Sequence, residues 1–258
     1  QNIKIDYQNA QGDQSNLNSI CKKFVGDGVD VIVAIATPSA QAAAAATSEI
    51  PIIFSAVTDP VAAKLVTNLE KPEGNVTGTS DAIPVDEVFE LCQELTPEVK
   101  TFGFLYTTSE VNSQSVVEEA KALAPDYGYA YEEVAITNTS ELKQAAYSLA
   151  GKVDAIYTPI DNSIASAMTV LSEVGQETEV PIYVGADSMV MDGAYATVGI
   201  NYEDLGRQTG DMVAEVLNGK AIRDLPVATL DEFQKVINKT TAKAIGAPET
   251  SEGALIVE

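Results

Sequence analysis

Short apolar runs alternate with one-sided helical patterns along almost the whole chain, and this alternation limits the fold more than any other feature of the sequence. Short continuous apolar runs are typical of parallel strands that are buried on both faces. The stretches between the runs repeat apolar residues at helical spacing, as Leu17, Ile20, Cys21 and Phe24 do. The pattern predicts an α/β fold with doubly wound parallel sheets. The predicted strands cover residues 31–35, 52–54, 102–106, 153–157 and 182–184.

The alternation falls into two blocks, which we interpret as two lobes. A loop and short strand over 73–80 lead out of the first block, and Pro84 suits the first turn of a helix that opens the second. A helix over 205–216 stops at Asn218-Gly219, and a strand over 233–237 with a helix over 240–245 finishes one sheet. We expect lobe 1 to contain residues 1–79 and 201–221, lobe 2 to contain 80–200 and 222–247, and 248–258 to be a C-terminal tail. The multi-segment hinge is expected near 79–81, 199–201 and 220–222.

The first residues do not fit the opening of such a lobe. Ile3, Ile5 and Tyr7 alternate with polar residues, which predicts a strand at a sheet edge. A doubly wound lobe should instead open with a buried apolar strand. We therefore expect that the first strand and helix of lobe 1 are absent from this chain.

Composition excludes several classes of function. The 258 residues include 38 acidic and 15 basic side chains, a net charge of −23, so we expect no nucleic-acid partner. Because there is no His, Ser-His-Asp and Cys-His machinery and imidazole metal ligands are excluded, and we predict no metal and no cofactor. Cys21 and Cys92 are expected to be buried thiols. No window approaches a membrane-spanning length, and the start of the chain does not resemble a secretion signal.

Polar residues follow each predicted strand, at the edge where ligands of open α/β sheets bind. In the first lobe the hydroxyls of Thr37, Ser39, Ser55 and Thr58, with free N–H groups at helix starts, suit an anion such as a carboxylate. The alternative is that Thr37 and Ser39 only cap the following helix.

In the second lobe, Asp161 and Asp187 are placed to receive a cation or to bind hydroxyls. Asp161 or Asn162 could instead cap a helix. A pair of carboxylates could also serve a small hydrolase, but no phosphate loop, dinucleotide fingerprint or nucleophile elbow accompanies them.

Five segments together carry a family resemblance: 37–42 (TPSAQA), 51–60 (PIIFSAVTDP), 75–80 (NVTGTS), 110–113 (EVNS) and 201–206 (NYEDLG). They resemble the ABC-transporter substrate-binding proteins of the tryptophan/tyrosine-type family, in the type I periplasmic binding protein superfamily. The resemblance runs from Asn2 to Gly246. Members of the family normally begin with one more strand and helix, which agrees with the deficit inferred above.

The resemblance implies an extracytoplasmic, non-enzymatic binding protein, either a lipoprotein or periplasmic, that delivers an aromatic amino acid to ABC permease subunits and works as a monomer. The ligand is expected between two lobes that close about the hinge. By the same resemblance, Thr37, Ser39, Ser55 and Thr58 hold the carboxylate, and Asp187, or else Asp161, holds the ammonium. Tyr106, Pro159 and Met189 are candidate walls for the side chain. The predicted ligand-binding residues are Thr37, Ser39, Ser55, Val57, Thr58, Ser80, Asp81, Tyr106, Glu110, Asn112, Ser113, Pro159, Asp161, Asn162 and Asp187.

Other functions of the same fold stay open at this point. The ligand could be another amino acid, a nucleoside or a sugar. A sensor domain of a transcriptional regulator is a further alternative, although no basic DNA-binding segment precedes the first lobe.

Overall fold

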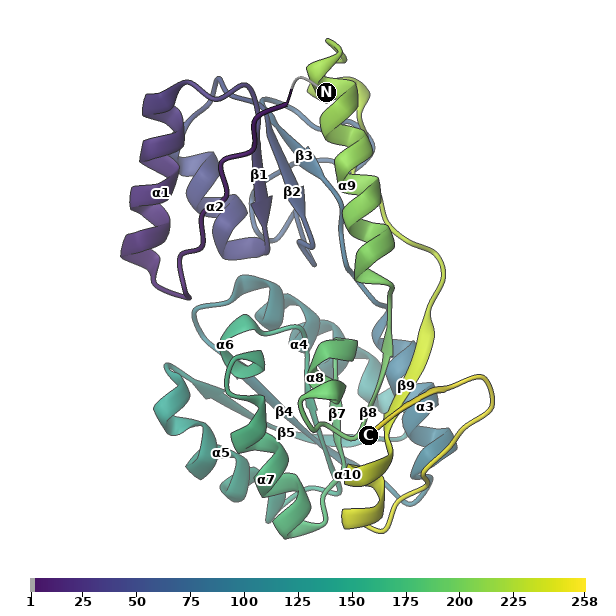
Figure 1. The fold of residues 1–258 in the computed structure, drawn as a ribbon. Helices are drawn as coiled ribbons and strands as arrows, with labels where there is room; N and C mark the ends of the chain where they lie inside the picture. Colours follow the sequence, from purple (N-terminus) through teal and green to yellow (C-terminus); the bar gives the residue numbers. More distant parts are fainter. Residues whose placement is uncertain (1–2) are drawn as a thin grey trace. The chain divides into compact units, whose positions relative to one another are not determined.

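The computed structural model describes residues 3–258, so Gln1 and Asn2 of the predicted first lobe lie outside the described residues. The chain divides into two compact units (Figure 1). Unit 1 contains Gln1–Ser80 and Glu203–Thr229, and unit 2 contains Asp81–Tyr202 and Leu230–Glu258. The described chain passes between the units at three points, 80/81, 202/203 and 229/230. The predicted α/β fold with two lobes and parallel sheets is confirmed.

Unit 1 is built on a parallel sheet, which in the described part of the chain has three strands in the order β1-β2-β3. These are β1 (Ile32–Ile35), β2 (Ile52–Ser55) and β3 (Val76–Gly78). Helix α2 (Thr37–Ala46) packs against β1 and β2, and α1 (Gln14–Asp27) packs against α2 (Figure 1). Ile53 of β2 packs instead with Met212 of α9 (Tyr202–Leu217) and with Ile222 of a 3₁₀ turn, Ile222–Asp224.

The strand predicted over residues 3–7 is wrong. Residues 3–10 form neither helix nor strand, and Ile3, Ile5 and Tyr7 are 71%, 82% and 75% exposed. Alternation of apolar and polar residues makes a strand only where a neighbouring strand supplies hydrogen bonds, and β1 pairs with β2 alone among the described strands. For the same reason β1 is an edge strand with Ile35 61% exposed, and is not buried on both faces as predicted. The expected absence of a first strand and helix stays a prediction.

Unit 2 is built on a larger sheet, with seven described strands in the order β10-β9-β8-β7-β6-β4-β5. Neighbouring strands are parallel except β8 and β9, which are antiparallel. The strands are β4 (Thr101–Thr107), β5 (Ala130–Ile136), β6 (Ala155–Thr158), β7 (Ile182–Val184), β8 (Ala196–Gly199), β9 (Gln234–Asn238) and β10 (Leu255–Val257).

Helices cover both faces of this sheet. Because successive residues of a strand point to opposite sides, each central strand contributes side chains to two cores. Phe102 and Phe104 of β4 belong to a first core, together with Phe89 of α3 (Val85–Leu95), whereas Leu105 belongs to a second core, together with Leu171 of α7 (Met168–Thr178). The helices are α3 (Val85–Leu95), α4 (Val111–Leu123), α5 (Leu142–Ala150), α6 (Asn162–Ala165), α7 (Met168–Thr178), α8 (Asp187–Met191) and α10 (Lys239–Ala244), with 3₁₀ turns at Ala124–Tyr127 and Thr139–Glu141.

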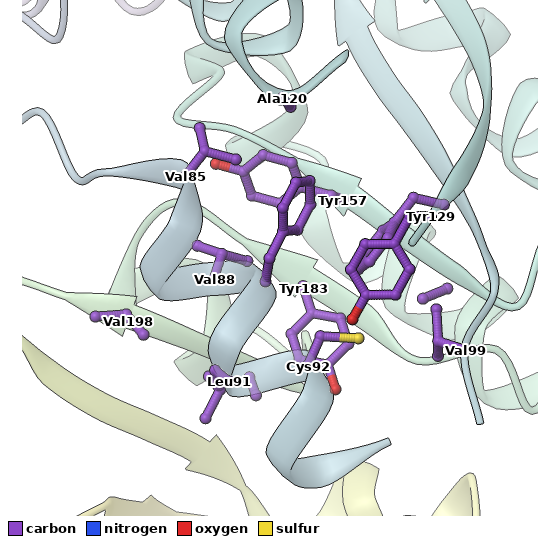
Figure 2. Close-up of a cluster of buried hydrophobic side chains, with 14 of the residues drawn as sticks. Val85, Val88, Leu91, Cys92, Val99, Ala120, Tyr129, Tyr157, Tyr183 and Val198 are labelled. Carbon is purple, nitrogen blue, oxygen red and sulfur yellow. The ribbon is translucent and has the colours of Figure 1, made fainter. Parts of the chain in front are cut away.

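Both cysteines are buried free thiols, as predicted. The Cys92 thiol lies in the first core among tyrosine rings (Figure 2). Its Sγ is 3.3 Å from Thr96 Oγ1, which in turn lies 2.8 Å from the Tyr183 hydroxyl. Burial raises the pKa of the Cys92 thiol, so the thiol stays protonated and packs as a small apolar group.

Two boundaries of the predicted lobes differ from the structure by more than two residues. Residues 222–229, and with them the hinge expected at 220–222, belong to unit 1, since Ile222 and Leu225 pack against Ile53. Residues 248–258 are not a tail: β10 pairs with β9 as an edge strand of unit 2. Strands β5 and β8 were not predicted, and β5 gave little signal because most of its residues are exposed.

Candidate functional site

Strands β1 and β2 of unit 1 are each followed directly by an alanine with positive φ. Ala36 has φ 70° and ψ 159°, and Ala56 has φ 56°. Residues with a Cβ rarely adopt these conformations, which cost about 1–3 kcal/mol each and cluster at functional sites. The strain marks the carboxyl ends of β1 and β2, the edge at which the sequence predicted a site.

The start of α2 directly follows Ala36 and has no side-chain cap among the described residues. The first helical hydrogen bond runs from Ala40 N–H to the Ala36 carbonyl at 3.1 Å, so the N–H groups of Thr37 and Ser39 precede it. The alternative that Thr37 and Ser39 only cap this helix is therefore wrong. An uncapped helix start with adjacent hydroxyls is suited to bind an anion.

The other predicted residues of unit 1 lie beside this edge. Ser55 ends β2, and its Oγ is 2.9 Å from Thr209 Oγ1 of α9. Thr58 is buried, and its carbonyl accepts a hydrogen bond from Ser80 Oγ at 3.0 Å. Val57 is fully buried in the interior of unit 1. The segments that follow β2 and β3 are thus tied together.

In unit 2, Glu110 closes the start of the short helix α6. Its buried carboxylate accepts hydrogen bonds from the N–H and side-chain amide of Asn162, at 2.8 and 2.7 Å, and from the N–H and hydroxyl of Ser163, at 2.8 and 3.0 Å. Burial and the negative charge of Asp161 raise the pKa of Glu110. These bonds give Glu110 a structural role.

Asp161 is the N-cap of α6, as one of the alternatives held. Its Oδ1 accepts from the Ile164 N–H at 3.0 Å, and its Oδ2 accepts from the N–H and hydroxyl of Thr107, both at 2.8 Å. The side chain is fully buried. Both oxygens are engaged, so Asp161 is a poor candidate for holding a ligand cation or for acid-base catalysis.

Asn112 and Ser113, in the first turn of α4, both donate to the Ile160 carbonyl, at 2.7 and 3.1 Å. Asn112 Oδ1 and Thr158 Oγ1 are buried and have no hydrogen-bond partner among the described residues. Buried polar atoms normally have a partner. Asn112 therefore keeps a free acceptor at this end of the unit 2 sheet.

Asp187 opens α8 directly after β7 and is half-buried. Its Oδ1 accepts from the Ser188 N–H at 2.7 Å, and its Oδ2 has no hydrogen-bond partner in the described part of the chain. Nearby, Tyr202 donates to Asp81 Oδ2 at 3.1 Å. Burial and the charges of Asp81 and Asp187 raise the pKa of Tyr202, so these groups form one acidic cluster in unit 2.

The predicted walls for an aromatic side chain have different surroundings. Tyr106 is half-buried against the first core of unit 2, and Pro159 is buried in the loop after β6. Met189 is 1% exposed and packs in the second core, which contradicts its assignment as a wall.

Within residues 3–258, no group of three or more His, Cys, Asp or Glu is placed to hold a metal ion. No helix in that range is both long and apolar enough to cross a bilayer.

Two α/β units, each with polar side chains at the carboxyl ends of its strands, are the arrangement of a small-ligand binding protein with the type I periplasmic-binding-protein fold. The chain belongs to the ABC transporter substrate binding protein family, whose model matches residues 1–252. This is a family of binding proteins without enzymatic activity. A small hydrolase acting through Asp161 and Asp187 is therefore not supported.

Within this family, the chain is similar to proteins of known ligand and to solved structures. It is 49% identical over 250 residues to a tyrosine-binding protein of Clostridioides difficile, covering 97% of this chain and 72% of the relative. A Streptococcus pneumoniae ABC domain in complex with L-Trp matches with a TM-score of 0.94 and 43% identity, covering 99% of this chain and 88% of that one. A conserved domain protein of Vibrio cholerae matches with a TM-score of 0.94 and 40% identity, covering 100% and 88%.

Proposed function

We propose that this protein captures an aromatic amino acid for an ABC importer. The observation that carries the proposal is the uncapped start of α2 beside two strained alanines, where β1 and β2 end. This edge has the donors that a carboxylate needs. A tyrosine-binding relative and an L-Trp complex at more than 40% identity support the choice of ligand.

In this proposal each unit supplies part of the site. Thr37, Ser39 and Thr58 of unit 1 hold the carboxylate, with the N–H groups at the start of α2. Asp187 of unit 2 holds the ammonium through its Oδ2, which has no hydrogen-bond partner among the described residues. Asp161, the alternative for this role, is dropped because both of its oxygens are engaged.

The aromatic side chain lies against Tyr106 and Pro159 in this proposal, and the free Asn112 acceptor faces a polar group of the ligand or a water. Ser80 and Asp81 stand where the chain first passes between the units. A ligand that is contacted by groups of both units stabilises one arrangement of the units over others.

Calorimetric titration tests the ligand class. L-Tyr, L-Trp and L-Phe should bind, whereas L-Leu and L-Lys should give little heat. Tight binding of another amino acid, a nucleoside or a sugar, with none of the three aromatic amino acids, would contradict the proposal.

The variant Asp187→Ala tests the ammonium contact. We expect the affinity for the aromatic amino acid to fall by about 10- to 100-fold, because a hydrogen-bonded charge is lost. Asp192→Ala is the matched control, since Asp192 is an exposed carboxylate at the other end of α8. Equal affinities of the two variants would remove Asp187 from the site.

The same proposal includes the cellular context. The protein acts outside the cytoplasmic membrane as a monomer, held by a lipid anchor or free in the periplasm, and delivers its ligand to permease subunits. Membership of the substrate-binding family supports this context.

A further inference from the structure

Three hydroxyl groups from distant parts of the chain meet inside unit 1. Thr209 Oγ1 of α9 lies 2.9 Å from Ser55 Oγ and 2.8 Å from Thr79 Oγ1. Thr209 also donates to the Leu205 carbonyl one turn earlier in α9, at 2.8 Å. Thr79 and Thr209 are 0% and 4% exposed, whereas Ser55 is 9% exposed and is the member that a ligand can reach.

The protons of this cluster can be assigned from its geometry. A hydroxyl donates one proton and can accept two. Only one arrangement places a proton in each of the three contacts: Thr209 donates to the Leu205 carbonyl, which can only accept. Thr209 Oγ1 must therefore accept from both Ser55 and Thr79. The Ser55 hydroxyl therefore donates its proton to Thr209, and only the lone pairs of Ser55 Oγ can interact with a ligand.

We infer that Ser55 meets the ligand as a hydrogen-bond acceptor, and that Thr209 is the positioning residue that fixes this polarity. The inference rests on the proposed function and changes the role that the sequence analysis gave Ser55, because Ser55 cannot donate to the ligand carboxylate. Its oxygen suits the ammonium of an amino acid, which only donates. Unit 1 then binds the ammonium of the ligand as well as its carboxylate.

The variant Ser55→Ala separates the two roles of Ser55. Its affinity is measured by calorimetry for L-Tyr and for 3-(4-hydroxyphenyl)propionate, which has the same carboxylate and ring but no ammonium. If Ser55 accepts from the ammonium, the affinity for L-Tyr falls about tenfold while that for the analogue is unchanged. If Ser55 donates to the carboxylate, both affinities fall equally, which would overturn the inference.

The variant Thr209→Val keeps the shape of the side chain and frees the Ser55 proton. We expect it to reduce the preference for L-Tyr over the analogue about tenfold, and Thr209→Ser to restore it. Thr178→Val is the matched control, because Thr178 makes the same bond to a carbonyl one turn earlier, Val174, at 2.7 Å in unit 2. An unchanged preference in Thr209→Val would overturn the positioning role.

Binding by the wild type separates a failure of the proposed function from a failure of the acceptor role of Ser55. If it binds none of the aromatic amino acids, the proposed function fails. If it binds L-Tyr but Ser55→Ala loses affinity for both compounds alike, the proposed function stands and the acceptor role of Ser55 fails. The Ser55→Ala result decides the question even if Thr209→Val does not fold.

Discussion

At the scale of single residues, Ala36 and Ala56 carry the clearest sign of a site. Neither is polar or charged, so the sequence analysis gave neither a role in the site, yet each has a positive φ, a backbone region that favours glycine. Each directly follows a strand, and Ala36 also precedes a helix with an uncapped start. The strain is stored where the chain turns to expose N–H groups.

Replacing Ala36 with glycine should stabilise unit 1. Removal of about 1–3 kcal/mol of strain outweighs the roughly 1 kcal/mol of added freedom in the unfolded chain, so we expect a gain of about 1 kcal/mol in the free energy of unfolding. Urea titration measures it. Ala45→Gly, at an exposed position of α2, is the control and should lose about 1 kcal/mol. A loss in both variants would mean that Ala36 is not strained.

At the scale of elements, the loop after β6 is fixed from several sides. Asn112 and Ser113 bind the Ile160 carbonyl, and Asp161 caps α6. Gly185, which follows β7, approaches the same loop: a Cβ on Gly185 would lie 2.6 Å from Ile160 N. The loop that the sequence singled out for its carboxylate thus serves to hold the end of the sheet together.

The variant Gly185→Ala should move this loop and destabilise unit 2. The added carbon meets backbone atoms on both Pro159 and Ile160, which cannot rotate away, so we expect a loss of about 1–3 kcal/mol in thermal unfolding. Gly151→Ala is the control, since the nearest atom there is 3.7 Å away. Equal melting temperatures for the two variants would show that the loop yields freely.

Most elements could be predicted because their apolar pattern matches what they bury. The runs at 52–54, 102–106 and 182–184 became β2, β4 and β7. Roles in the site were harder to predict. The sequence pattern of a carboxylate after a strand is the same in two cases: the carboxylate can cap a helix, as Asp161 does, or keep an oxygen without a partner in the described residues, as Asp187 does. The difference depends on Thr107, which lies 54 residues from Asp161 in the sequence and which only the folded chain places beside it.

At the scale of the whole molecule, the many carboxylates and the lack of histidine determine how the free energy of unfolding depends on pH. The chain has 38 acidic residues and no His, so no side chain with an ordinary pKa titrates between about pH 5.5 and 8. Burial and the negative charge of Asp161 raise the pKa of Glu110 above its ordinary value. Its folded form holds a proton more readily than its unfolded form does, so its contribution to the free energy of unfolding falls as pH rises through the raised pKa.

The variant Glu110→Gln tests this dependence. We expect the wild type to lose stability in urea titrations as pH rises above the ordinary glutamate pKa of 4.5, and the variant to lose less over the same range. The variant should also be less stable at pH 5, since its amide nitrogen would face donors on Asn162 or Ser163. If the variant keeps the wild-type slope, other carboxylates cause the pH dependence.

The three passages of the chain between units also set an order of events during synthesis. The strands of unit 1 leave the ribosome first, but Ile53 packs with Met212 and Ile222, which follow β8 in the chain. Unit 2 likewise waits for β9 and β10, which complete one side of its sheet. A nascent chain that stops near residue 200 therefore leaves both units with open apolar surfaces, and we expect each unit to complete its folding only after nearly the whole chain has emerged.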